Sequence, residues 1–226
     1  MKKLVILTGA GMSSESGIKT FRDSGGLWEE HDVAEVATPM AWSNNQNLVL
    51  KFYNERRREL AGCKPNDGHL GLVELEKNFD VQIITQNIDD LHERAGSSNV
   101  LHLHGELTKA RSTKDQSLVY DIGYKDINAG DLCDVGSQLR PHIVWFHEDV
   151  PMMDEAVRIA GEADIFVVIG SSLNVYPAAG LINFAPVDTT LWLIDPKDVA
   201  VPKNRRVEII KMKASEGVAL LRERLV

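Results

Sequence analysis

Apolar residues along this chain fall into short runs that alternate with longer amphipathic stretches. Five runs rich in Val, Ile and Leu predict strands, at residues 4–7, 81–84, 165–169, 191–194 and 207–210. Four stretches predict helices, at residues 44–60, 68–77, 154–163 and 215–225. Asp154 and Ser215 are the expected N-caps of the last two helices. This alternation predicts βαβ units, and therefore an α/β fold with a Rossmann-like parallel sheet and helices on both faces.

Two segments break the alternation. Residues 108–138 are polar, weakly periodic and dotted with glycine, which predicts a small inserted module outside the sheet. Residues 20–38 contain Phe21, Arg22, a Gly25-Gly26 pair and Trp28, a composition typical of a loop that covers a ligand. An ordinary connection between elements is the alternative for this second segment.

Composition narrows the class of protein. The 226 residues, 43% hydrophobic and 26% charged, suffice for one α/β domain with a small insertion. No run approaches the roughly 18 apolar residues of a membrane helix, and no cleavage-site pattern follows Met1, so we expect a cytoplasmic protein without a membrane partner. The net charge of -8 argues against nucleic acid and favours Lys-rich protein substrates. Cys63 and Cys133 are too few for a disulfide framework or a Cys-only zinc site.

A glycine-rich turn, Gly9-Ala10-Gly11, lies where the first strand meets a helix. Glycine lets backbone N–H groups approach a pyrophosphate closely, so this turn is a candidate dinucleotide site. The third glycine of the usual fingerprint is absent, with Ser14 in its place, and no acidic residue ends an obvious second strand. The turn by itself is therefore compatible with an ordinary strand-to-helix connection.

Two further predicted strands end in polar side chains. The strand at 81–84 runs into Gln86-Asn87-Ile88-Asp89, and the strand at 165–169 runs into Gly170-Ser171-Ser172. Ligands of open parallel sheets bind just beyond the carboxyl ends of the strands. Three such ends favour a ligand site there more strongly than one.

His102 and His104 are two residues apart, which predicts that both lie on one face of a strand. They could serve as a general base, as a metal pair, or as structural histidines with local hydrogen bonds. Because His104-Gly105 follows the Gln86–Asp89 strand end closely, a catalytic base is plausible.

In combination these elements resemble the sirtuin family of NAD-dependent protein-lysine deacylases. The resemblance rests on five ordered motifs, which are Gly9-Ala10-Gly11-Met12-Ser13-Ser14-Glu15-Ser16-Gly17-Ile18 with Phe21-Arg22, Thr85-Gln86-Asn87-Ile88-Asp89, His104-Gly105, Arg140-Pro141-His142-Ile143-Val144-Trp145-Phe146, and Gly170-Ser171-Ser172-Leu173 with Pro177-Ala178-Ala179-Gly180. It implies that NAD is consumed as a co-substrate while an acyl-lysine is converted to lysine, nicotinamide and O-acyl-ADP-ribose. His104 would be the base, and Asn87 would help to present the reacting carbon.

The resemblance also implies a set of binding residues. Those expected to contact NAD are Gly9, Ala10, Gly11, Glu15, Phe21, Arg22, Trp28, Gln86, Asn87, Ile88, Asp89, Gly170, Ser171, Ser172, Asp195 and Ala214. Val144 and Phe146 would contact the peptide, which would lie as an added strand between the segment after Phe146 and residues 173–176.

Tyr53 and Arg56 are three residues apart on one predicted helix and therefore share a face. From spacing alone, the run Arg56-Arg57-Arg58 indicates a solvated basic patch. The Tyr-x-x-Arg pair resembles instead the desuccinylase and demalonylase type of sirtuin (class III), in which the guanidinium pairs with the distal carboxylate of the acyl group. We therefore expect succinyl, malonyl or acetyl lysine as substrate, with Tyr53 and Arg56 contacting the acyl tail.

Departures from the family concern the module and a few positions near the site. Many sirtuins hold a structural zinc with two Cys-x-x-Cys pairs, whereas this interval contains only Cys133, and Asp115, Asp121, Asp131 and Asp134 are poor substitutes. We therefore expect no zinc. His147 replaces a glycine and could crowd or contact the substrate strand, and Asp90 also replaces a glycine.

For the whole chain, residues 1–226, we expect a single, monomeric catalytic domain. Its Rossmann-like large part would comprise about 1–30, 80–106 and 140–226, and its small module about 31–79 and 107–139. Three alternatives remain at this stage: a metal-dependent hydrolase using His102, His104, His142 and His147, a non-catalytic NAD-binding module, and a mono-ADP-ribosyltransferase of the same family.

Overall fold

The computed structural model describes residues 1–19, 27–28, 31–201 and 205–226. A six-stranded parallel sheet in the order β11-β10-β9-β1-β4-β5 forms its larger part. The strands are β1 (Lys3–Thr8), β4 (Asp80–Thr85), β5 (Val100–His102), β9 (Ile165–Ile169), β10 (Thr190–Ile194) and β11 (Val207–Ile210). The predicted parallel sheet is thus confirmed. β5 was not among the five apolar runs, but it contains His102 of the histidine pair that was expected on a strand.

The strand order places the carboxyl ends of three strands side by side. β1 lies between β9 and β4, and Thr8, its last residue, pairs in register with both Ile169 and Thr85. The chain therefore leaves all three strands at the same edge of the sheet. This is the switch point at which open α/β sheets bind ligands.

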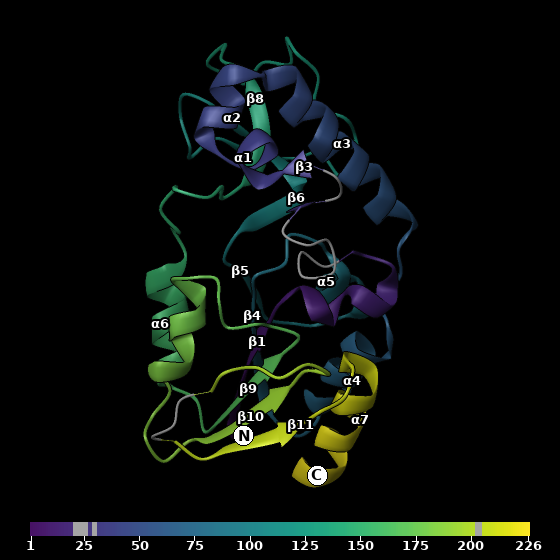
Figure 1. Cartoon of the computed structure of the whole chain (residues 1–226), viewed down its shortest axis with the longest axis vertical. Coiled ribbons are helices and arrows are strands. Elements are labelled where there is room, and N and C mark those ends of the chain that lie inside the picture. The colour runs from purple at the N-terminus through teal and green to yellow at the C-terminus, as the bar shows by residue number, and fades with distance from the viewer. Residues whose placement is uncertain (20–26, 29–30, 202–204) are drawn as a thin grey trace.

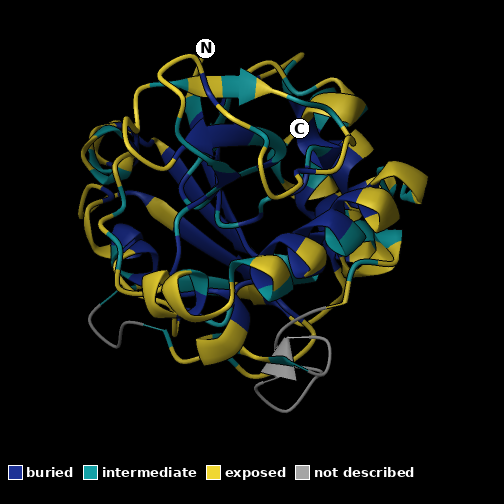
Figure 2. Cartoon of the chain, turned by 90° about the horizontal axis from the view of Figure 1, so that it is seen from above, coloured by how far each residue is buried: buried dark blue, intermediate teal, exposed yellow. Residues whose placement is uncertain are grey.

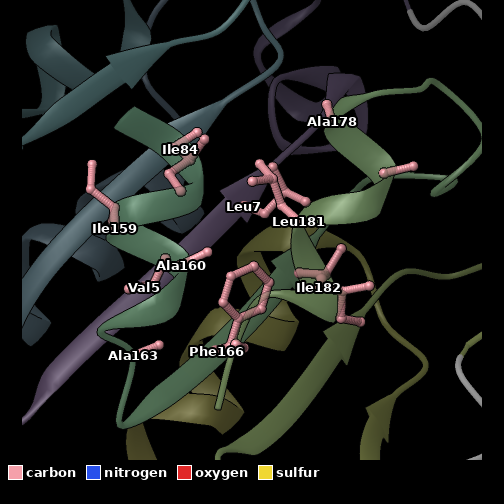
Figure 3. Packing of buried hydrophobic residues seen from close by; sticks show 14 of the residues in the cluster. Val5, Leu7, Ile84, Ile159, Ala160, Ala163, Phe166, Ala178, Leu181 and Ile182 are labelled. Carbon is pink, nitrogen blue, oxygen red and sulfur yellow. The ribbon is translucent and has the colours of Figure 1, made fainter. Parts of the chain in front are cut away.

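Helices cover both faces of this sheet (Figure 1). On one face lie α6 (Met153–Gly161) and the 3₁₀ helix η3 (Ala178–Asn183), where Phe166 packs between Ala160 and Ile182 (Figure 3). On the other face lie α4 (Asp67–Leu75) and α7 (Ala214–Leu225). Figure 2 shows the result, with buried strands inside and exposed residues on the outer helices and loops. Within the described ranges, no helix has the length and apolar character that a membrane crossing requires.

The smaller part of the molecule, in the upper half of Figure 1, contains a separate antiparallel sheet. Its three strands are β6 (Gly105–Ser112), β7 (Val119–Asp121) and β8 (Leu139–Ile143), so the polar segment at 108–138 does lie outside the main sheet. Helices pack on it, namely α1 (Val33–Val36), α2 (Pro39–Asn44) and α3 (Gln46–Gly62). The remaining elements are η1 (Ala10–Met12), η2 (Ser14–Ser16), β2 (Leu27–Trp28), β3 (His31–Asp32) and α5 (Leu91–Ala95).

Two details differ from the sequence analysis. The segment at 64–79, which was expected in the small module, contains α4, whose Leu72 and Leu75 pack with Leu4 and Ile6 of β1 on the main sheet. The predicted N-caps are wrong, because α6 begins at Met153 and α7 at Ala214, so Asp154 and Ser215 lie inside the first helical turn. Met152 and Lys213 occupy the N-cap positions, and neither side chain caps its helix.

Candidate active site

The glycine turn after β1 packs directly on the turn after β9. Gly9 N–H donates to the Ile169 carbonyl at 3.0 Å, and Gly11 N–H donates to the Gly170 carbonyl at 2.9 Å. A Cβ added to Gly11 would lie 2.6 Å from Gly170 Cα, and Gly170 itself has a φ of +62°. Without side chains at these positions, the two turns can pack directly against each other at the edge of the sheet.

The strand end after β4 is tied to the strand end after β9. Ser171 Oγ donates to Gln86 Oε1 at 2.7 Å, and Ser171 is buried. The predicted residues Gln86 and Ser171 thus meet across the edge of the sheet. All three polar strand ends are thereby joined by hydrogen bonds.

A buried polar cluster of Ser13, Asn87 and Asp89 lies beside this edge. Ser13 Oγ donates to Asp89 Oδ2 at 2.9 Å and accepts from Asn87 Nδ2 at 3.1 Å. Burial raises the pKa of Asp89 to about 6, against the opposing effect of its hydrogen bonds from Ser13 and the Leu91 N–H. The cluster therefore holds a carboxylate that titrates close to neutral pH.

Ser13 is a residue that the sequence analysis did not single out. It lies in a segment with Ser14 and Ser16, and no periodicity distinguishes which of the three faces the sheet edge. Its signal in the sequence was only its place within the first motif.

His104 lies in the bend between β5 and β6, next to the same edge. Its Nδ1 is 3.0 Å from the Gln86 carbonyl oxygen, which can only accept, so Nδ1 holds the proton and Nε2 has the lone pair. Burial lowers the pKa of His104, although the Gln86 hydrogen bond opposes this. The imidazole is therefore neutral near pH 7 and can accept a proton at Nε2.

His102 has a different environment, and the two histidines do not share a strand face as expected. β5 ends at His102, and that ring lies with Nδ1 3.1 Å from the Asn87 carbonyl and Nε2 2.7 Å from Glu93 Oε1. Burial favours the neutral ring, but the hydrogen bond and charge of Glu93 outweigh it and raise the pKa of His102. Nowhere in the described ranges do three or more His, Cys, Asp or Glu side chains gather as metal ligands. The geometry thus does not support the metal-dependent alternative.

The other predicted NAD contacts occupy varied positions. Ala10 is in the turn after β1, Ser172 follows Ser171, and the Ile88 carbonyl accepts from Leu107 N–H. Glu15 and Asp195 already bond backbone groups, because Glu15 accepts from Ser215 N–H and Asp195 from Lys197 N–H. Ala214 is the buried first residue of α7. Phe21, Arg22 and the side chain of Trp28 lie outside the described residues.

Tyr53 and Arg56 lie one turn apart on α3, but their environments differ. Tyr53 is fully buried, and its hydroxyl oxygen accepts from Trp145 Nε1 at 3.0 Å. Burial raises the pKa of Tyr53. Arg56 forms a forked pair with Glu59 at 3.0 and 3.2 Å, and its guanidinium lies 5.0 Å from the centre of the Phe52 ring.

The run of three arginines on α3 is not a uniform solvated patch. The Arg56 side chain is only 14% exposed. Arg57 is buried and donates to the Leu107 carbonyl and to Asn54 Oδ1, both at 2.7 Å. Arg58 is the exposed member and pairs with Asp126. Each guanidinium therefore has its own partner, which the sequence run did not reveal.

The predicted peptide segment after β8 is anchored on both sides. Val144 N–H donates to the His104 carbonyl at 2.9 Å, and Phe146 N–H donates to the Ala37 carbonyl at 3.0 Å. Phe146 is 43% exposed, and His147 has a left-handed φ of +71°. Glu148, which the sequence analysis missed, accepts from Arg140 at 2.7 Å and from Trp145 N–H at 2.8 Å. These bonds fix the backbone next to His104.

The donor set of the small module does not fit a structural zinc. Cys133 is buried, and its Sγ lies 3.3 Å from Ser112 Oγ and 3.1 Å from Ser137 Oγ. Asp115 and Asp121 each accept a backbone N–H two residues ahead, which is a turn-forming role. One thiol and locally committed carboxylates do not make a tetrahedral site.

Comparisons with known proteins agree with this arrangement. Residues 9–177 match the pattern of the Sir2 family. An NAD-dependent protein deacylase from Bacteroides thetaiotaomicron is 53% identical over 234 residues and covers 100% of this chain and 99% of its own length. A protein of the same description from Helicobacter pylori (strain J99) is 54% identical over 228 residues, with 100% and 96% covered.

A solved structure supports the same assignment. A Sir2 homologue in complex with NAD superposes with a TM-score of 0.88 at 38% identity, covering 100% of this chain and 91% of the other. The sequence match, the full-length relatives and the shared fold lead to one conclusion. This chain belongs to the Sir2 family, the sirtuins.

Proposed function

We propose that this chain uses NAD to remove acyl groups from the lysines of proteins, as its full-length relatives are named to do. The observation that supports this best is the Ser13–Asn87–Asp89 cluster with His104 beside it, at the edge where Gly9 and Gly11 exclude side chains. The overall reaction takes an acyl-lysine, NAD and water to lysine, nicotinamide and O-acyl-ADP-ribose.

We expect NAD to lie at this edge because ligands of open parallel sheets bind just beyond the carboxyl ends of the strands. Gly9, Gly11 and Gly170 would line the dinucleotide closely, with Ser171 and Ser172 beside it. Asn87 and Asp89 would hold the nicotinamide end, since Ser13 already fixes both side chains. Preorganised polar groups lower the cost of placing the reacting carbon next to the acyl oxygen.

His104 would act as the general base. Its Nε2 lone pair can take a proton from a ribose hydroxyl, which then attacks the acyl carbon. The Gln86 carbonyl stabilises the resulting imidazolium, because it accepts from Nδ1–H in both protonation states. The Val144 backbone, bonded to the His104 carbonyl, would bring the peptide strand to this ring.

For the acyl group we propose succinyl or malonyl lysine, with acetyl lysine as a poorer substrate. Arg56 donates two hydrogen bonds to the carboxylate of Glu59. An acyl carboxylate would need the same forked geometry. Tyr53 lies one turn away on the same helix, and its hydroxyl oxygen accepts from Trp145 Nε1. An anionic tail would thus meet a cation on α3, next to this phenol.

The test compares peptides that contain acetyl, malonyl or succinyl lysine, each with and without NAD. We expect nicotinamide and free lysine to form in equal amounts, only with NAD and only with an acylated peptide. Activity should persist in a chelator, and label from NAD should leave with the small product. NAD-independent hydrolysis that a chelator stops would favour the hydrolase instead. Label that remains on the protein acceptor would favour ADP-ribosyl transfer.

A further inference from the structure

Two buried histidines outside the reacting groups lie edge to face against each other. His69 of α4 and His92 of α5 have no exposed surface, and their ring centroids are 4.9 Å apart with planes inclined at 62°. The proposed reaction uses neither ring. Each has one nitrogen with a hydrogen-bond partner, and that partner determines where the proton of the neutral ring resides.

His69 has its proton on Nε2. The Asn66 backbone N–H, which can only donate, lies 3.2 Å from His69 Nδ1, so Nδ1 must have the lone pair. This bond is half of the capping box at the start of α4. The Nε2–H donor is buried and has no partner within the described residues.

His92 also has its proton on Nε2. The Thr8 hydroxyl donates its single proton to Thr85 Oγ1 at 2.8 Å. The contact of 3.1 Å between Thr8 Oγ1 and His92 Nε2 therefore requires Nε2–H to donate. His92 Nδ1 is left as a buried acceptor, again with no partner in the part of the chain that the structure describes.

The two unpaired nitrogens are complementary, one a donor and the other an acceptor, on rings that already touch. We propose that His69 Nε2–H donates to His92 Nδ1, completing a one-directional relay from Asn66 through His69, His92 and Thr8 to Thr85. An unpaired polar atom in the interior is unfavourable, so pairing both nitrogens at once favours the arrangement.

Both rings must be neutral for this pairing, since an imidazolium donates from both nitrogens. Burial lowers the pKa of His69 to about 4 and holds the pKa of His92 well below its usual value. Near pH 7 the pair is thus one donor and one acceptor, as the relay requires.

Each end of the relay contacts a segment of the candidate active site. Thr85 Oγ1 accepts from Asn87 N–H at 3.0 Å, and Thr8 immediately precedes the Gly9 turn. At its other end, Asn66 Nδ2 donates to the Met12 carbonyl at 2.9 Å and to Ser16 Oγ at 3.0 Å, on either side of Ser13. We therefore assign His69 and His92 as positioning residues that hold Ser13 and Asn87 together. This consequence, unlike the pairing itself, rests on the proposed function.

Nitrogen NMR on the unliganded protein with ¹⁵N-histidine tests the pairing directly. At neutral pH we expect both rings to have the proton on Nε2, with a scalar coupling between His69 Nε2 and His92 Nδ1 across the hydrogen bond. A proton on Nδ1 of either ring, or the lack of that coupling, would overturn the proposal. This readout needs neither NAD nor activity.

The variant His69→Asn tests the positioning role. Its amide oxygen can replace Nδ1 as acceptor for Asn66 N–H, but the side chain is too short to reach His92. We expect the His92 Nδ1 resonance to shift, and kcat/KM for NAD to fall by about tenfold, mainly through KM. Wild-type values of both in the folded variant would contradict the assignment.

Ser97→Ala is the matched control. Ser97 follows α5, and its hydroxyl is likewise buried and unpaired among the described residues, yet it is not part of the relay. We expect the KM of Ser97→Ala for NAD to equal that of the wild type. If its KM rises as much as that of His69→Asn, the positioning role of His69 is overturned. If the wild-type protein releases no nicotinamide, the proposed function fails while the NMR result still decides the pairing.

Discussion

The edge of the main sheet and the face of α3 use side chains of similar chemistry in different ways. At the edge, Ser13, Asn87 and Asp89 come from two strand ends and bond one another in the interior. On α3, Tyr53 turns inward to Trp145, whereas Arg56, one turn away, holds Glu59 near the surface. The first region is a closed network, and the second is an ion pair that a ligand could replace.

This difference indicates that the sheet edge performs the common reaction step and that α3 selects the acyl group. Groups locked in a buried network suit a step that every substrate must undergo, because their positions cannot adjust. A guanidinium in a partly exposed pair can exchange one carboxylate for another at small cost, since such pairs contribute little by themselves. We therefore expect changes at the sheet edge to affect all acyl groups equally, and changes on α3 to affect anionic acyl groups alone.

The largest expected effect is that of His104→Ala. Loss of a general base should lower kcat for formation of the free-lysine peptide by about 10²- to 10⁴-fold, by the same factor for acetyl and succinyl peptides. Steady-state kinetics with both peptides measures this, and the melting temperature checks that the variant is folded. A loss confined to one acyl group would place His104 outside the common step.

Gly105→Ala should disrupt the junction at which the chain passes from β5 of the main sheet to β6 of the antiparallel sheet. Gly105 has a φ of +82°, and an added Cβ would lie 2.0 Å from the His142 carbonyl oxygen. Strain and clash together should lower the free energy of unfolding by about 3 kcal/mol or more. Denaturant titration measures this change.

Gly130→Ala is the control for that change, because Gly130 has a similar φ of +93° with nothing within 4 Å of the added Cβ. Gly130→Ala should lower the free energy of unfolding by only about 1 kcal/mol. Equal losses for both variants would mean that the close approach at Gly105 is unimportant.

Arg56→Ala should show most clearly that α3 affects only anionic acyl groups. Loss of a charge-assisted pair should lower kcat/KM for a succinyl peptide by about 10- to 100-fold while leaving an acetyl peptide nearly unaffected. Arg58→Ala is the matched control, since Arg58 is exposed and pairs with Asp126. If Arg56→Ala reduces both activities alike, Arg56 does not select the acyl group.

Glu59→Gln should have the smallest effect, in the opposite direction. Glu59 occupies the Arg56 fork that we assign to the acyl carboxylate. Removing its charge should raise kcat/KM for the succinyl peptide by about two- to fivefold, which is the effect expected for a partly exposed ion pair. A decrease would show instead that Glu59 holds Arg56 in place for the substrate.

Much of the sheet edge was predictable from the sequence. In a parallel sheet all strands end at one edge, so polar residues after β1, β4 and β9 had to meet once the strands were recognised. Which serine after Gly11 faces inward was not predictable, because η1 and η2 turn too tightly for a pattern of period 3.6 to apply. The Glu93 partner of His102 was not predictable either, because the fold brings α5 next to the end of β5.

The α3 face was predictable only in part. Spacing placed Tyr53 and Arg56 on one side of a helix, but the partner of Tyr53 is Trp145, 92 residues away. The predicted boundary of the small module was wrong for a similar reason. α4 packs on β1 of the main sheet, although it follows the helices of the small module in the sequence.

The sequence by itself determined the parallel α/β fold, the strand ends that form the site, and the family, because these depend on local periodicity and on ordered motifs. Only the tertiary structure decided which hydrogen-bond partners His69, His92 and His104 have, that Ser13 joins Asn87 to Asp89, and that Arg56 is already paired. Proton positions and ion pairs depend on distances of a few ångströms between distant segments, which periodicity along one chain does not encode.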